Sequence, residues 1–242
     1  MKQRLTYAML TCLCLMIASS VQAQKPYVID SEGRKIEGDA IQATEKGAIK
    51  LKIGAGVRTF APDDYRLAFS PKPTDVERLE SMLEQENYDI ILERGAAIFT
   101  KYKYLGWAGR ITYLRAQAHL AKNQPEQALN LVENAEPFVK RNEVQVRIAR
   151  VNALLQLDRN DEAEELLAEL KKAESDQVAA FAFNAAGDLL AKRGNKKDAV
   201  LEYLKTVLVI DSEVAPEAQK VARERVVELL KEMGDKRYEK FQ

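Results

Sequence analysis

Alanine recurs at nearly constant intervals along the C-terminal two thirds of the chain, each time shortly after a polar stretch. It stands at Ala128 in "NQPEQALNLV", at Ala163 in "RNDEAEELL" and at Ala199 in "NKKDAVLEYL", at intervals of 35 and 36 residues. Ile91 in "ENYDIILERG" takes the same place 37 residues before Ala128. A period of this length, with two helices in each copy, is typical of repeats built from helix pairs. The pattern therefore predicts a mainly helical chain from residue 74 to residue 242.

The stretch "GDLLAKRGNKKDA", from Gly187 to Ala199, is the most regular copy. A glycine in a helix interior costs about 0.5–1 kcal/mol relative to alanine, so we expect Gly187 to serve close helix packing. Gly194 is expected to turn the chain between two helices. With Tyr203 as a large packing residue on the second helix, this spacing resembles the tetratricopeptide repeat (TPR) family. The resemblance implies an α-solenoid of antiparallel helix pairs.

The other copies depart from this spacing. Asn123 and Asp158 stand where Gly194 turns the chain, and asparagine tolerates the left-handed backbone conformation. An apolar set on the last helix, including Val221 and Val226, is expected to cap the end of the array, as solenoids require. An unrelated array of helical hairpins is the alternative. The expected units span residues 74–103, 104–139, 142–173 and 176–211, followed by a capping helix at 215–233.

Residues 24–70 have a different pattern and predict a small β domain. Ile49, Leu51 and Ile53 alternate with lysines, as in a strand with one buried face. Turn sequences separate four or five such runs, which predicts a small β-barrel or sheet. Residues 71–73 form a proline-containing linker, after which Thr74 and Glu77 have the spacing of a capping box that begins a helix. We expect the β domain to dock on the N-terminal end of the helical part.

The first 23 residues have the pattern of a secretory signal peptide. Lys2 and Arg4 precede a run of 14 mainly apolar residues, and Val21-Gln22-Ala23 offers a cleavage site. The run is shorter than the ~20 residues that span a bilayer, so no stable membrane insertion is expected after cleavage. Both cysteines lie inside this segment. The expected location is the periplasm or the medium, with a lipoprotein or an uncleaved membrane anchor as alternatives.

The charge balance and the reactive side chains indicate a non-enzymatic protein. Thirty-seven basic and 37 acidic side chains cancel, whereas nucleic-acid binders carry a basic surface. His119 is the only histidine, and we expect it to pack or to face solvent rather than bind a metal. Asp63 and Asp64 are expected to be ordinary turn residues. No catalytic, cofactor-binding or metal-binding residue is therefore predicted, and an uncharacterised hydrolase is the weakest alternative.

The TPR resemblance implies that the first helix of each pair lines a concave groove that binds another protein or a peptide. The residues at the matching positions mix amides, aromatic rings and few charges, and the alternative is that they are merely solvated. The implied groove residues are Arg110, Tyr113, Gln117, Gln145, Ile148, Asn152, Phe181, Asn184 and Asp188.

The sequence thus predicts an exported scaffold for protein–protein interaction in a bacterial envelope. The main alternative is a module that binds carbohydrate or an envelope polymer through aromatic side chains of the β domain. The aromatic residues available for this are Tyr27, Phe60, Tyr65 and Phe69.

Overall fold

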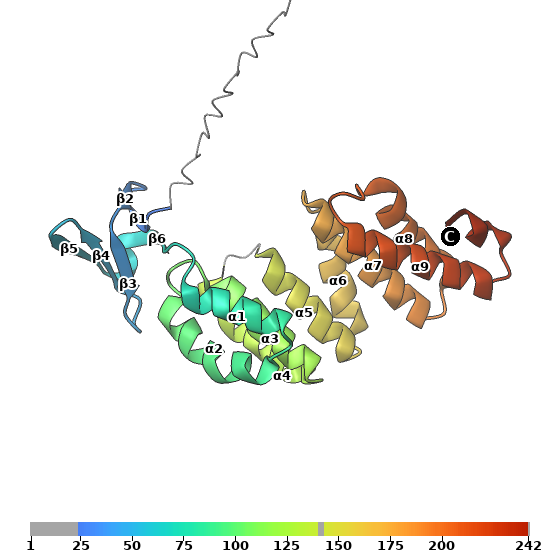
Figure 1. Cartoon of the computed structure of the whole chain (residues 1–242), viewed down its shortest axis with the longest axis horizontal. Helices are drawn as coiled ribbons and strands as arrows, with labels where there is room; N and C mark the ends of the chain where they lie inside the picture. Colours follow the sequence, from blue (N-terminus) through green and yellow to red (C-terminus); the bar gives the residue numbers. More distant parts are fainter. Residues whose placement is uncertain (1–23, 140–142, 242) are drawn as a thin grey trace, which may run out of the picture.

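The computed structural model describes residues 24–139 and 143–241, and it is mainly helical with β structure near the N-terminus (Figure 1). The predicted signal peptide and the first residue of the unit 142–173 lie outside the described residues. Within the described ranges, no helix combines the length and the apolar character needed to cross a membrane.

The β segment forms two antiparallel sheets of three strands each, in the orders β2-β1-β6 and β3-β4-β5. β1 pairs with β6, so the sheet joins the beginning and the end of the segment, with Val28 opposite Ala68. β3, β4 and β5 follow one another as a meander. The strands are β1 (Tyr27–Asp30), β2 (Lys35–Glu37), β3 (Ala40–Ala43), β4 (Ile49–Ile53), β5 (Gly56–Phe60) and β6 (Tyr65–Phe69).

The two sheets enclose one core. Ile49 and Leu51 are fully buried in it, whereas Ile53, predicted on the same face, is 43% exposed because it lies at the end of the β4–β5 hairpin. The strand ladders stay separate, so the predicted barrel does not close and six strands form instead of four or five. Gly38 joins β2 to β3, and a Cβ atom there would lie 2.5 Å from the carbonyl oxygen of Lys52. The chain therefore passes against β4 here with no room for a side chain.

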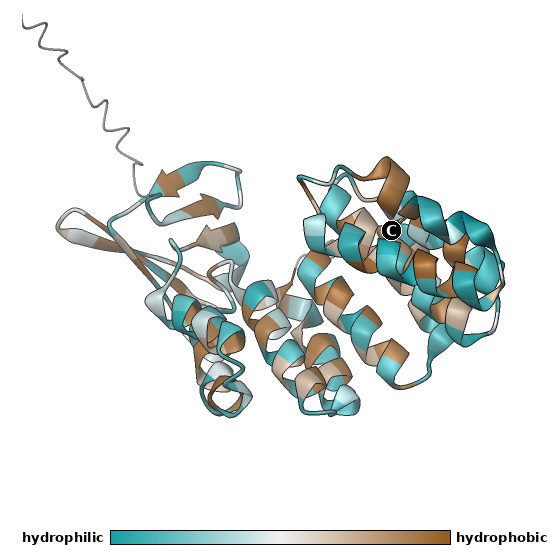
Figure 2. Ribbon diagram, turned by 45° about the vertical axis from the view of Figure 1, so that its right-hand side comes forward, coloured by the Kyte–Doolittle hydropathy of each residue, from teal (hydrophilic) through white to brown (hydrophobic). Residues whose placement is uncertain are grey.

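The helices follow in sequence, and each packs on the next. Some first helices of successive pairs also touch, namely α1 with α3, α3 with α5 and α7 with α9. Apolar and polar segments alternate along the ribbons in Figure 2. The helices are α1 (Thr74–Glu84), α2 (Tyr88–Tyr102), α3 (Ala108–Ala121), α4 (Pro125–Ala135), α5 (Val144–Gln156), α6 (Asn160–Leu170), α7 (Asp176–Lys192), α8 (Lys196–Val209) and α9 (Pro216–Glu232), with short 3-10 turns η1 (Pro62–Asp64), η2 (Glu136–Phe138) and η3 (Lys236–Phe241).

The same tight turn ends α1, α3, α5, α7 and α9. In each turn one residue has a positive φ, its N–H bonds three residues back, and the next N–H bonds five residues back, which is the Schellman arrangement. In every case the next helix or 3-10 turn begins two residues after the residue with positive φ. The five turn residues are Glu86, Asn123, Asp158, Gly194 and Gly234.

The β sheets pack against the connection between α2 and α3. Leu105, in this connection, is buried in the core of the β segment. The N–H of Ser70 donates to the carbonyl oxygen of Leu105 at 3.2 Å. The indole Nε1 of Trp107 donates to the carbonyl oxygen of Ser70 at 3.0 Å. The expected contact between the β segment and the first helices is therefore present, and it is made by the loop after the first helix pair.

Candidate functional site

The nine predicted groove residues lie on the first helices of three successive pairs. Three belong to α3, three to α5 and three to α7, at steps of three or four residues that place each triplet on one side of its helix. Eight of them are partly or largely buried, and Asp188 is exposed, with 54% of its side chain accessible to solvent. Their neighbours decide which of them remain available to a partner.

Arg110, the only cation of the set, is occupied within the chain. Its Nε donates to Glu80 Oε1 on α1 at 2.7 Å, and Lys72 contacts the other oxygen of the same carboxylate. Burial alone would raise the pKa of Glu80, but the hydrogen bonds from Lys72 and Arg110 outweigh it and hold that pKa below its usual value. Arg110 therefore joins α3 to α1, and its charge is neutralised there.

Two predicted groove residues on α7 are also engaged in packing. The amide Nδ2 of Asn184, a buried residue, donates to the carbonyl oxygen of Ala218 on α9 at 2.8 Å. Asp188 accepts a hydrogen bond of 2.6 Å from the hydroxyl of Tyr203 on α8. Both side chains therefore tie α7 to its neighbours. Of the predicted groove residues, Asn184 and Asp188 are thus engaged within the chain, because the helices that follow α7 supply their partners.

The apolar members of the set form part of the surface between successive pairs. Tyr113 packs, partly buried, against the clusters on both sides of α3. Ile148 and Phe181 pack, also partly buried, against one cluster shared by α5, α6 and α7. Each of these side chains thus covers core atoms with one part and presents the rest to solvent.

Three amides remain, namely Gln117 on α3 and Gln145 and Asn152 on α5. They are half-buried, and none forms a hydrogen bond to another side chain or backbone group in residues 24–139 and 143–241. An amide side chain can donate and accept at once, so it can bind a peptide group irrespective of the peptide's sequence. This row of amides, with the three apolar side chains beside it, is the part of the predicted groove that is free to act.

A second candidate site lies in a cleft between the β sheets and the helices. Tyr27 and Phe69 stack with their ring centres 5.2 Å apart on one side. Tyr104 and Phe138 meet edge to face at 5.4 Å on the other, and Lys103 Nζ lies 4.4 Å from the centre of the Phe138 ring. Ligand pockets are commonly lined by aromatic side chains with a few polar groups and often lie between structural units.

Sequence reasoning found only one wall of this cleft. Tyr65 lines it, and its hydroxyl donates to the carbonyl oxygen of Gly47 at 2.7 Å, while burial raises the pKa of Tyr65. Phe60, one of the four aromatic residues available for such a role, is buried in the β core and does not reach the cleft. Tyr104 and Phe138 were missed because they lie outside the β segment, and no local pattern pairs them with it.

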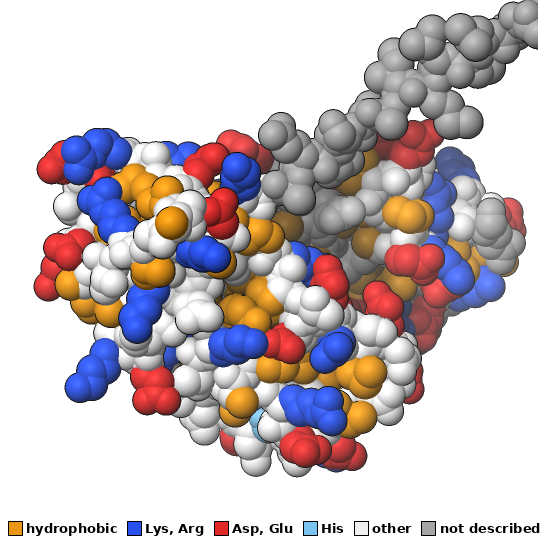
Figure 3. Space-filling view, turned by 60° about the vertical axis from the view of Figure 1, so that its left-hand side comes forward, with side chains coloured by type: hydrophobic (Ala, Val, Ile, Leu, Met, Phe, Trp, Pro, Cys, Tyr) orange, Lys and Arg blue, Asp and Glu red, His pale blue; other side chains and the backbone are white. Residues whose placement is uncertain are grey.

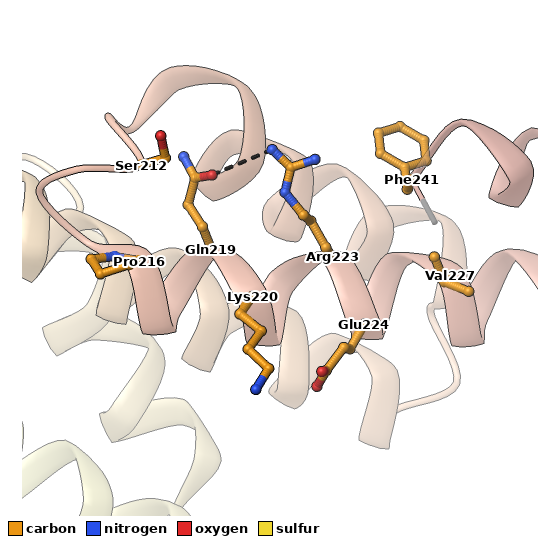
Figure 4. A pocket seen from close by; sticks show the side chains of 8 residues that line it. All are labelled: Ser212, Pro216, Gln219, Lys220, Arg223, Glu224, Val227 and Phe241. Carbon is orange, nitrogen blue, oxygen red and sulfur yellow. Dashed lines mark hydrogen bonds between the residues drawn. The ribbon is translucent and has the colours of Figure 1, made fainter.

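A shallow hollow near the C-terminus carries polar groups but no acid–base pair (Figure 4). Arg223 donates to Gln219 Oε1 at 3.5 Å, and Gln219 in turn donates to the carbonyl oxygen of Ile210. Lys220 and Glu224 point away from these two side chains in Figure 4. The Gln219 amide thereby fixes the segment between α8 and α9, which is a structural role.

Metal and histidine chemistry find little support in the described part of the chain. Among those residues, no three or more His, Cys, Asp and Glu side chains are grouped so as to hold a metal ion. His119 is half-buried, with a small part visible in pale blue in Figure 3, and its Nδ1 is 2.9 Å from Gln124 Oε1 across the α3–α4 turn. Comparison with known proteins gives no relative, since no family model, no curated protein and no solved structure matches this chain.

Proposed function

We propose that this chain is an exported, non-catalytic scaffold in which a TPR-like array of antiparallel helix pairs binds another protein as an extended peptide. The observation that carries the proposal is the row of unengaged amides, Gln117, Gln145 and Asn152, beside half-buried apolar side chains on α3, α5 and α7. Amides suit the backbone of a peptide, and the apolar side chains suit its side groups.

The repetition of the turns supports the array. The residues with positive φ recur at intervals of 37, 35, 36 and 40. A fold in which each pair contacts mainly its neighbours lengthens by stacking, and it offers one continuous surface along its first helices. The export part of the proposal rests on the sequence of residues 1–23.

Site-specific photo-crosslinking of the exported protein in its own cells would test this function. A crosslinking amino acid at Gln145 is expected to capture a partner protein, and the same group at Asn130, an exposed residue of α4, serves as the control. With the crosslinking amino acid at position 148 instead, replacing the three amides together by alanine should abolish capture of that partner. Equal capture from Asn130 and Gln145 would contradict the proposal.

A carbohydrate-binding role is the second candidate, because the aromatic cleft has two ring-lined walls. The C–H faces of a sugar pack on aromatic rings, while its hydroxyls bond to polar groups at the rim such as Lys103 and Glu143. Titration with envelope oligosaccharides should give saturable heat release that Tyr104→Ala removes. Tyr238→Ala, on η3, is the control. Binding that is unchanged by Tyr104→Ala would exclude the cleft.

A further inference from the structure

The outer face of α8 carries an apolar stripe that no part of the described chain covers. Leu201 is 58% exposed and Leu208 is 70% exposed, with the partly buried Leu204 between them. Val209 beside them is 73% exposed. Because successive leucines are three and four residues apart, they lie on one side of the helix. The α8 stripe, as we call these four residues, therefore faces solvent along the length of α8.

The packing of the helix pairs does not require these leucines. Leu201, Leu204 and Leu208 lie seven, ten and fourteen residues after Gly194, the residue with positive φ in their turn. The equivalent positions of the earlier pairs are found by counting from Glu86, Asn123 and Asp158. There they hold exposed polar or small residues or a proline and never a leucine: Glu93, Ala96 and Thr100; Asn130, Glu133 and Pro137; and Glu165, Ala168 and Lys172. Leucine at all three places is thus specific to α8.

The stripe continues into a neighbouring hollow. Leu201 and Leu204 line a surface depression together with Leu230, Met233 and Phe241, from α9 and η3. A further depression joins Leu201, Leu204 and Leu208 along α8 itself. Continuous exposed apolar surface of this kind marks an interaction site more often than isolated apolar residues do.

The charges at the two ends of the stripe are opposite. Lys197 lies in the first turn of α8, and Asp211 lies two residues beyond its last residue; both are exposed. Within the part of the chain that the structure describes, neither side chain forms an ion pair, although the Asp211 carboxylate accepts the N–H of Glu213 at 2.8 Å. Asp198, also exposed, lies beside Lys197, and Lys205 pairs with Glu202 next to the leucines. Lys197 and Asp211 thus mark the two ends of an apolar stripe that other charges flank.

We propose that the α8 stripe is the interface of a homodimer in which the α8 helices of two copies pack antiparallel. In a twofold-symmetric interface each patch meets its own copy, so a face must be complementary to itself after half a turn. An axis near Leu204 places Leu201 of one copy beside Leu208 of the other. The same axis places Lys197 beside Asp211 twice. This self-complementarity is what selects a second copy as the occupant, and the inference does not depend on the proposed function.

Sedimentation equilibrium of residues 24–242 over a range of concentrations tests the interface. We expect a reversible dimer, and Leu208→Glu should weaken it by at least ~10-fold because the charge would be buried against Leu201 of the other copy. Val221→Glu is the matched control, since Val221 is 44% exposed on α9 outside the stripe. A monomer at every concentration would overturn the proposal, as would equal effects of the two variants.

A charge exchange tests the antiparallel orientation without touching the leucines. Lys197→Asp alone and Asp211→Lys alone should each weaken the dimer, because each places like charges together at both ends. The double variant restores both pairs with reversed signs and should recover most of the lost affinity. Recovery supports the antiparallel arrangement, and a double variant weaker than either single one overturns it. Both positions are exposed, so circular dichroism should remain unchanged throughout.

Discussion

At the scale of single residues, the sequence predicted one close helix contact, at Gly187, and the structure places the ring of Tyr203 against this glycine. A Cβ atom on Gly187 would lie 2.7 Å from two carbons of the Tyr203 ring, and Tyr203 is almost completely buried. Burial and the hydrogen bond to Asp188 raise the pKa of Tyr203, so the hydroxyl stays protonated and donates. The glycine thus allows α7 and α8 to approach across an aromatic ring.

We therefore expect Gly187→Leu to lower the free energy of unfolding by ~2 kcal/mol or more, through overpacking of this contact. Thermal and urea melts measure the loss. To show that the clash with Tyr203 is the cause, Gly187→Ala is measured in the wild type and in the Tyr203→Leu variant. It should cost less free energy of unfolding in the variant, where the smaller side chain relieves much of the clash. A midpoint that does not change in Gly187→Leu would remove Gly187 from the helix contact.

Glu80 gives a second prediction at this scale, on pH. Its pKa is lowered in the folded protein, so its contribution to stability is full above its unfolded pKa and is lost as the pH falls through the folded value. Glu80→Gln should accordingly lose less stability than the wild type between about pH 5 and pH 3. Glu77→Gln, on the same helix, is the control, because Glu77 forms no ion pair within the described ranges. Parallel stability curves for Glu80→Gln and the wild type would contradict the assignment.

At the scale of elements, the inter-helix turns determine where helices end. Gly194 adopts a positive φ without strain, but Glu86 holds φ at +57° with a side chain that is not suited to it. Glu86→Gly should stabilise the protein by ~0.5–1 kcal/mol, the relief of strain less the added entropy of the unfolded chain. Gly194→Ala should destabilise by a similar amount. Denaturant melts of both variants check the pair, and a destabilising Glu86→Gly would show that its side chain has an undetected role.

The helical elements were more predictable from sequence than the strands. Gly194 and Asn123 signal their turns directly, whereas Glu86 has no such signal and its turn follows only from the period. Thr74 was expected to cap α1, but Pro73 occupies the N-cap and no side chain caps the helix, because α1 begins one residue earlier than the capping box requires. The pairing of β1 with β6 joins residues some forty positions apart, which no local alternation can reveal.

At the scale of the whole molecule, a groove residue proposed from the sequence stays available to a partner only where no neighbouring helix engages its side chain. Gln117, Gln145 and Asn152 meet this condition. Arg110, Asn184 and Asp188 do not, since α1, α9 and α8 provide their partners, and those contacts depend on how the pairs stack. Only the side of the aromatic cleft formed by the β segment could be predicted from the sequence, because Tyr104 and Phe138 approach that segment only in the folded chain.

The same dependence between distant parts leads us to predict that the β segment does not fold alone. Residues 26–70 are close to the size at which one core is marginal without disulfides or metals, and the segment contains neither cysteine nor histidine. The core of the β segment also includes Leu105 from the α2–α3 connection, and Trp107 packs against this core. Residues 24–73 expressed alone should give poorly dispersed amide signals in NMR, whereas 24–121, which adds α1 to α3, should restore the dispersion. The chain 24–242 should melt in one transition, and Leu105→Ala should lower its free energy of unfolding by the ~2–5 kcal/mol typical of such a cavity. A well-dispersed spectrum from 24–73 would make the β segment an independent domain and show that its core folds without Leu105.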